Sequence, residues 1–134
     1  MTRFVIDAPV AIRIATDRAV IPVGHALVAP TLLRSQVLAL MYAAVREGRI
    51  EEWSARRVLD GIRALRIRLL GDRVLQAGAW EVARRLDWPD TYAAEYIALT
   101  RLQADALVTL DDEVADAARA FVRVAPLHEL LEPP

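Results

Sequence analysis

The sequence predicts an α/β fold in which a central, mostly parallel sheet lies between two layers of helices. Short apolar runs, typical of strands buried on both faces, alternate with longer segments whose apolar residues recur at helical spacing. No linker, repeat or low-complexity segment divides the 134 residues, a length that suits one domain with one core. We therefore expect a single domain over residues 1–134, arranged as a three-layer α/β/α sandwich.

In the first half of the chain, three expected strands alternate with three expected helices. Strands are expected at residues 4–6, 26–29 and 66–70. Helices are expected at residues 9–17, 31–48 and 51–64. Pro9 suits the first turn of a helix, and Thr31 suits the N-cap of the next one. In that second helix, apolar residues fall on one face at Leu33, Val37, Leu40, Met41, Ala44 and Val45.

The second half continues the alternation. Asp72 is expected to cap a helix over residues 72–86, and Trp88-Pro89 ends that segment. Asp90 or Thr91 can cap the helix that follows. Further helices are expected at residues 92–103 and 111–120, and strands at 106–109 and 121–124. The prolines from residue 126 onward predict a closing loop and tail.

Composition excludes several classes of protein. The absence of Cys excludes disulfides and thiolate zinc sites, and two His residues are too few for a His-based metal site. Neither a secretory signal nor a membrane span is visible, so we expect a cytoplasmic protein without membrane contact. The net charge is −1, and all 17 basic residues are Arg. This is typical of a GC-rich genome, and it also suits bidentate binding of phosphate.

Two aspartates follow apolar strands and form the candidate site. Asp7 comes directly after the first strand, and Asp111 follows the strand at residues 106–109. Either residue alone is also typical of a helix cap or a turn. In parallel sheets, however, ligands bind at the carboxyl ends of the strands, where both side chains would meet. Two neighbouring carboxylates repel each other unless a cation lies between them, which favours Mg²⁺ or Mn²⁺.

Three short runs resemble the PIN-domain family, and in particular the VapC ribonuclease toxins of bacterial toxin–antitoxin pairs. The strand that delivers Asp7 resembles the opening of a PIN domain. A Tyr-Ala-Leu helix, followed by an apolar strand that ends in Thr-x-Asp, resembles the C-terminal signature of VapC. The runs are Phe4-Val5-Ile6-Asp7-Ala8, Thr91-Tyr92-Ala93-Ala94-Glu95-Tyr96-Ile97-Ala98-Leu99 and Ala106-Leu107-Val108-Thr109-Leu110-Asp111. The order of elements matches over nearly the whole chain, which implies a PIN-like fold.

The resemblance implies four acidic residues around one or two divalent ions. Asp7 and Asp111 match two of these positions, whereas Gln36 and Ala93 stand at the other two. At about 100° per residue, Asp90 lies only about 60° around the helix from Ala93 and can replace the missing ligand. It is equally suited to capping the helix.

Three neighbours complete the list of candidates. Gln36 offers a neutral oxygen to an ion or to a bound water. Arg34, close to it in sequence, is a candidate contact for RNA phosphate, although a solvated surface role is common for Arg. Thr109 can support the ligands through its hydroxyl, or simply belong to the end of the strand.

The function expected from the resemblance is that of a Mg²⁺- or Mn²⁺-dependent endoribonuclease, the toxin of a toxin–antitoxin pair. Its expected partners are an RNA substrate, a small antitoxin protein and a second copy of the chain in a homodimer. An alternative is a PIN-like module that binds RNA or an antitoxin-like protein without cleaving, which Gln36 and Ala93 favour. A receiver-like α/β domain is a third reading, and the absence of Lys argues against it.

Overall fold

Four parallel strands form the centre of the protein in the computed structural model, which describes residues 1–134. Their order across the sheet is β3-β2-β1-β4. The strands are β1 (Thr2–Ile6), β2 (His25–Pro30), β3 (Arg68–Leu70) and β4 (Ala106–Val108). β1 pairs in parallel with both β2 and β4, so it lies in the interior of the sheet. β2 and β3 therefore lie on one side of β1 in the sheet, and β4 lies on the other side.

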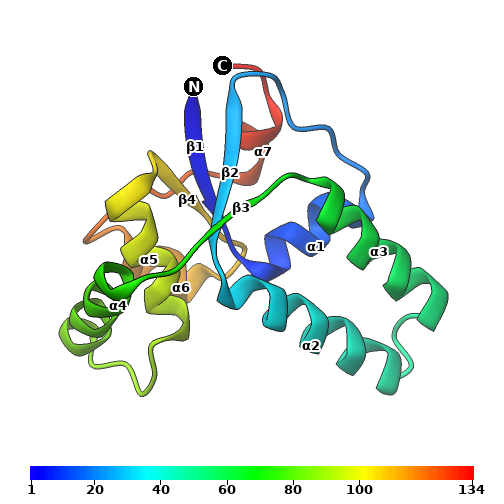
Figure 1. Ribbon diagram of the computed structural model, residues 1–134, viewed down its shortest axis with the longest axis horizontal. Coiled ribbons are helices and arrows are strands. Elements are labelled where there is room, and N and C mark those ends of the chain that lie inside the picture. Colours follow the sequence, from blue (N-terminus) through cyan, green and yellow to red (C-terminus); the bar gives the residue numbers. More distant parts are fainter.

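Helices cover both faces of this sheet, as Figure 1 shows. One layer holds α1 (Ala8–Thr16), α2 (Leu32–Arg46) and α3 (Glu52–Ala64). The other holds α4 (Arg73–Leu86) and α5 (Tyr92–Gln103), with α6 (Asp112–Ala118) after β4. The short helix α7 (Leu127–Leu131) lies near the two chain ends. The predicted three-layer α/β/α arrangement with a parallel sheet is confirmed. None of the helices has both the length and the apolar character that crossing a membrane requires.

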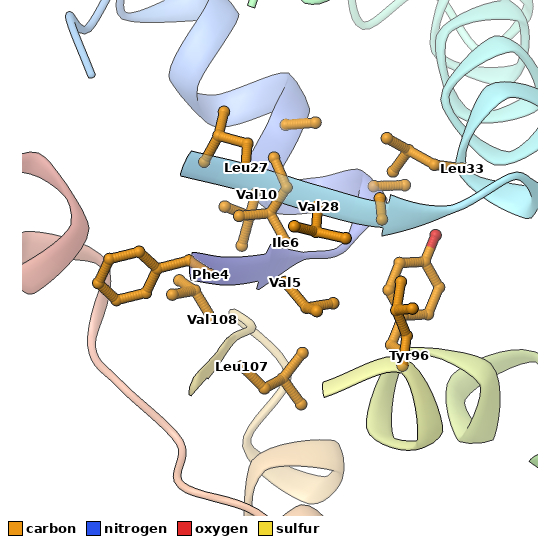
Figure 2. Packing of buried hydrophobic residues seen from close by; sticks show 14 of the residues in the cluster. Phe4, Val5, Ile6, Val10, Leu27, Val28, Leu33, Tyr96, Leu107 and Val108 are labelled. Carbon is orange, nitrogen blue, oxygen red and sulfur yellow. The ribbon is translucent and has the colours of Figure 1, made fainter. Parts of the chain in front are cut away.

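The core lies where the central strands meet the two helical layers, and Figure 2 shows part of it. Phe4, Val5 and Ile6 of β1 are at most 1% exposed, and Leu107 and Val108 of β4 are fully buried. Such continuous apolar strands are expected where helices cover both faces of a parallel sheet. Burial of each large aliphatic side chain contributes about 1.5–3 kcal/mol. The strands whose ends carry the candidate site are therefore buried in the hydrophobic core.

The C-terminal region differs from the prediction. Residues 121–124 were expected to form a strand, but only Val124 pairs, through an isolated bridge to Leu107. The backbone N–H groups of Phe121 and Val122 instead donate to Ala118 O, which extends α6 by a turn. The tail, expected to be a loop, contains α7, and its Leu130 is fully buried. The three apolar residues among 121–124 indicated a strand, but local helical hydrogen bonds satisfy part of this backbone instead.

Three smaller predictions concern the ends of elements. Asp72 caps α4 as expected, because its side chain accepts from Leu75 N at 2.9 Å. Thr31 precedes α2, but its side chain makes no capping bond, so the prediction of its capping role is wrong. Its backbone is already helical, with φ −57° and ψ −26°, whereas a capping residue is typically extended. Arg66 has a left-handed φ of 55°, which delays the start of β3 to Arg68.

Candidate functional site

A cleft of about 500 Å³ lies at the carboxyl ends of β1 and β4. This is the point where the order of the strands reverses, because β2 lies on one side of β1 and β4 on the other. Open parallel sheets bind ligands at such a point. The polar residues that line the cleft are Asp7, Gln36, Asp90, Tyr92, Tyr96 and Asp111. All four sequence-predicted residues for catalysis or metal binding therefore reach one cleft.

Asp7 is held between two elements at the end of β1. It is the N-cap of α1, and its Oδ1 accepts from Val10 N at 3.1 Å. Its Oδ2 accepts from the hydroxyl of Thr109 at 2.5 Å. Burial raises the pKa of Asp7 above its ordinary value and the charge of Asp111 raises it further, while both hydrogen bonds act in the opposite direction. Two hydrogen bonds thus hold the carboxylate at a position where burial disfavours its charged form.

Asp111 reaches the same cleft from the start of α6. Its Oδ1 accepts from Glu113 N at 3.0 Å and from Val114 N at 3.1 Å. Its Oδ2 makes no hydrogen bond within the protein. The cap interpretation and the site interpretation of this residue are therefore compatible, because capping uses only one of the two oxygens.

Thr109 links the two aspartates. Its hydroxyl donates to Asp7 and accepts from the backbone N–H of Asp111 at 3.2 Å. β4 ends at Val108, so Thr109 is not simply the last residue of the strand. The parallel register pairs Ile6 with Val108, and the next residue on each strand is then Asp7 and Thr109. The Thr109 hydroxyl therefore supports both aspartates, which is one of the two roles that the sequence suggested for it.

Asp90 occupies the position that the helical angle predicts. It lines the cleft together with Ala93, which lies on the first turn of α5. Its Oδ1 also accepts from Tyr92 N at 3.2 Å, so it satisfies a free amide at the start of the helix. Glu95, which lies two residues after Ala93 and so about 160° around the helix from it, does not line the cleft. Asp90 is therefore a helix-terminal residue with a carboxylate available to the cleft.

Gln36 lines the cleft, and its side-chain oxygen is bonded to a neighbouring residue. Its Oε1 accepts a hydrogen bond from the hydroxyl of Tyr96 at 2.5 Å. Figure 2 shows the Tyr96 ring extending from α5, with its oxygen directed away from that helix. Burial is the largest cause of a raised pKa at Tyr96, and the charges of Asp7 and Glu95 add to it. The hydroxyl therefore stays protonated and acts as a donor.

Sequence reasoning gave Tyr96 no role of its own, because it was part of a helix motif. A polar-tipped aromatic residue among buried apolar neighbours was the one available signal.

Arg34 is a residue that the sequence placed near the site but that lies away from it in the structure. It lines a separate groove between α2 and α3 rather than the acidic cleft. Two residues along a helix turn the side chain by about 200°, so closeness to Gln36 in sequence did not bring Arg34 near it in space.

The cleft offers the type of ligand that a hard divalent cation binds, because Asp7, Asp90 and Asp111 all supply carboxylate oxygens. No group of three or more carboxylate or imidazole side chains is close enough together to hold a metal ion. Mg²⁺ is commonly bound by only one or two carboxylates, with water and substrate phosphate completing its shell. The residues therefore fit an ion held mainly by Asp7 and Asp111, with Asp90 farther out.

The fold and the cleft together define an α/β/α protein with an acidic crevice at the switch point of its sheet. The structure is similar to the crystal structure of PAE2754 from Pyrobaculum aerophilum, with a TM-score of 0.72 over 97% of this chain and 94% of that one. The two sequences are 18% identical, so the similarity shows a shared fold. No family model and no curated protein matches the sequence.

Proposed function

We propose that this protein is a PIN-like, metal-dependent endoribonuclease that acts as the VapC-like toxin of a toxin–antitoxin pair. The observation that carries the proposal is the pairing of Asp7 and Asp111 at adjacent strand ends, joined through Thr109. Burial is the main cause of the raised pKa of Asp7, and the negative charge of Asp111 in the same cleft raises it further. A divalent cation relieves that repulsion, and phosphodiester hydrolysis uses such a cation.

The residues of the cleft have distinct roles in this proposal. Asp111 holds the ion through Oδ2, which its helix cap leaves available, and Asp7 through a remaining lone pair of the carboxylate that accepts from Val10 N and Thr109. Asp90 adds negative charge at the rim. When bound, Mg²⁺ or Mn²⁺ supplies charge neutralisation for the phosphate and lowers the pKa of water. In the hydrolysis, a water oxygen bonds to phosphorus, one bridging P–O bond breaks, and the leaving oxygen takes a proton.

The proposed partners follow from the same surface. An acidic cleft suits a basic side chain, so an antitoxin that brings an Arg to Asp7 and Asp111 would inhibit the site. Large exposed side chains include Tyr42, Trp53 and Trp80, which are 66%, 59% and 70% exposed. Exposed aromatic residues of this size favour contact with a second subunit. A homodimer therefore remains part of the proposal.

A second candidate function is a PIN-like module that binds RNA or a protein without cleaving. Two observations favour it. Ala93 lines the cleft without a ligand atom, and the oxygen of Gln36 is already bonded to Tyr96. Such a module would keep the shape of the cleft while holding an ion weakly.

Cleavage of a labelled RNA in the presence of Mn²⁺ separates these functions. The wild-type protein should cleave, and Asp7→Asn and Asp111→Asn should lose the activity. Asp112→Asn is a matched control, because Asp112 is exposed beside Asp111 and does not line the cleft. Growth arrest on expression, relieved by Asp7→Ala, would support the toxin role. RNA binding without cleavage would identify the non-cleaving module, and the absence of both would reject the proposal.

A further inference from the structure

The side-chain amide of Gln36 has a defined orientation in the cleft. The Tyr96 hydroxyl donates to Gln36 Oε1, and Tyr96 is 3% exposed. If the amide were turned over, the hydroxyl would accept from nitrogen, and its own proton would have no acceptor among the protein's hydrogen bonds. An unsatisfied buried donor costs about 1–3 kcal/mol, so the observed orientation is favoured.

The orientation leaves the amide nitrogen of Gln36 free. Its Nε2 makes no hydrogen bond within the protein, and the residue lines the same cleft as Asp7 and Asp111. An amide nitrogen with two N–H groups does not ligate a hard cation, which takes oxygen. It is instead a donor suited to the unesterified oxygens of a phosphodiester. The cleft therefore combines acidic side chains with one neutral donor.

We infer that Gln36 contacts the RNA directly, by donating from Nε2 to a phosphate oxygen, and that Tyr96 is the positioning residue that orients it. This inference rests on the proposed function and names the phosphodiester as the group that the cleft recognises. It also assigns Gln36 to the substrate rather than to the metal ion. The Tyr96 side chain acts only through Gln36, because its hydroxyl proton is used in their shared bond.

A neutral amide at this position also changes the charge that RNA meets. A carboxylate there would add a negative charge beside Asp7 and Asp111 and would repel phosphate whenever no cation is bound. With Gln36, the cleft keeps a donor that works without an ion. Part of the RNA affinity should therefore persist in EDTA and should depend on Gln36.

The test compares RNA affinity and ion affinity in the same variants. Fluorescence anisotropy with a labelled single-stranded RNA in EDTA measures the first, and calorimetry with Mn²⁺ measures the second. Loss of one hydrogen bond corresponds to an affinity about 2–10-fold weaker, and this is expected for RNA with Gln36→Ala and Tyr96→Phe. Both variants should keep Mn²⁺ affinity within about twofold of wild type. Gln36→Glu should weaken RNA binding in EDTA and strengthen Mn²⁺ binding.

Two controls and one double variant make the result specific. Gln76→Ala changes an exposed glutamine of α4, and Gln103→Ala changes an exposed glutamine of α5, so neither should affect either affinity. In a double-mutant cycle, Tyr96→Phe should have no further effect on RNA affinity once Gln36 is Ala. A purely structural role of Tyr96 would not produce this dependence.

Several outcomes would overturn the inference. These are no RNA binding in EDTA, unchanged RNA affinity in Gln36→Ala, or a loss of Mn²⁺ affinity in Gln36→Ala as large as that in Asp111→Asn. The proposed nuclease function fails by a different result, which is wild-type protein that binds RNA but does not cleave it with Mn²⁺. Binding that depends on Gln36 would still support the RNA contact in that case.

Discussion

The hydroxyl of Thr109 donates to Oδ2 of Asp7 at 2.5 Å and joins two residues that are 102 positions apart in the chain. The bond exists because β1 and β4 pair in parallel, with Ile6 opposite Val108, so that the next residues leave the sheet side by side. The same hydroxyl accepts from the backbone of Asp111. One threonine thus fixes the spacing of both aspartates at the carboxyl edge of the sheet.

Removing this hydroxyl should destabilise the protein. Thr109→Val has a similar shape but leaves Asp7 Oδ2 and the N–H of Asp111 without their partner. A hydrogen bond to a charged group contributes about 1.5–3 kcal/mol, so we expect the free energy of unfolding to fall by about 2 kcal/mol in urea denaturation. Thr109→Ser keeps the hydroxyl and should lose much less. Equal stability of the Val and Ser variants would show that the bond is unimportant.

Asp7→Asn should remove a loss of stability that occurs as the pH rises toward neutral. Burial is the main cause that raises the folded-state pKa of Asp7 above the ordinary value of an aspartate. Between the unfolded and folded pKa values the folded state holds a proton that the unfolded chain has lost, so wild-type stability falls as pH rises through the folded pKa. The Asn side chain does not titrate, so the variant should not lose stability in this way as the pH rises.

Thermal unfolding from acidic to neutral pH tests the prediction, as the difference between wild type and variant. The advantage of Asp7→Asn should increase with pH and reach a plateau above the folded pKa of Asp7. Asp112→Asn, at an exposed position, should show no such increase. A difference in stability between variant and wild type that stays constant with pH would contradict a raised folded-state pKa at Asp7.

Two substitutions at Asp90 separate its roles in capping and in binding. Asp90→Asn keeps an oxygen that can accept from Tyr92 N, whereas Asp90→Ala removes it and should cost about 1 kcal/mol of stability. Both remove a negative charge from the rim of the cleft. At a partly exposed site that charge contributes roughly 1–1.5 kcal/mol, so calorimetry should show Mn²⁺ affinity about tenfold weaker in both. Unchanged affinity in Asp90→Asn would leave this residue only its role at the helix end.

The C-terminal helix should contribute to stability despite its position in the tail. Leu130 of α7 is fully buried, and truncating a buried leucine to alanine costs about 2–5 kcal/mol. Leu38→Ala is a matched control, because Leu38 is 59% exposed and its loss should cost about 0.5 kcal/mol or less. Urea denaturation measures both. A small effect of Leu130→Ala would show that α7 does not hold to the core in solution.

Much of the fold could be predicted from the sequence because local patterns determine it. Apolar runs located all four strands, and helical spacing located the long helices. The strand expected at residues 121–124 did not form, because a short segment with three apolar residues does not distinguish a strand from a turn that packs against the core. The delayed start of β3 depends on the left-handed backbone of Arg66, which alternation of residue types does not reveal.

The candidate site was predictable only in part. Asp7 and Asp111 were found because strand ends are visible in sequence, and Asp90 because the angle between residues on one helix is fixed. The bond between Gln36 and Tyr96 joins residues 60 positions apart on different helices, and it depends on how α2 and α5 pack across the sheet. No local pattern contains that information. The same limit explains why Arg34, near Gln36 in sequence, lies in another groove.

The central claim is that Asp7 and Asp111 form a site for a divalent ion, and calorimetric titration with Mn²⁺ tests it most directly. We expect the wild-type protein and the Asp112→Asn control to bind Mn²⁺ with a submillimolar dissociation constant. Asp7→Asn and Asp111→Asn should lose this binding while remaining folded. Absence of binding by the wild type at millimolar Mn²⁺, or unchanged binding by both variants, would contradict the account.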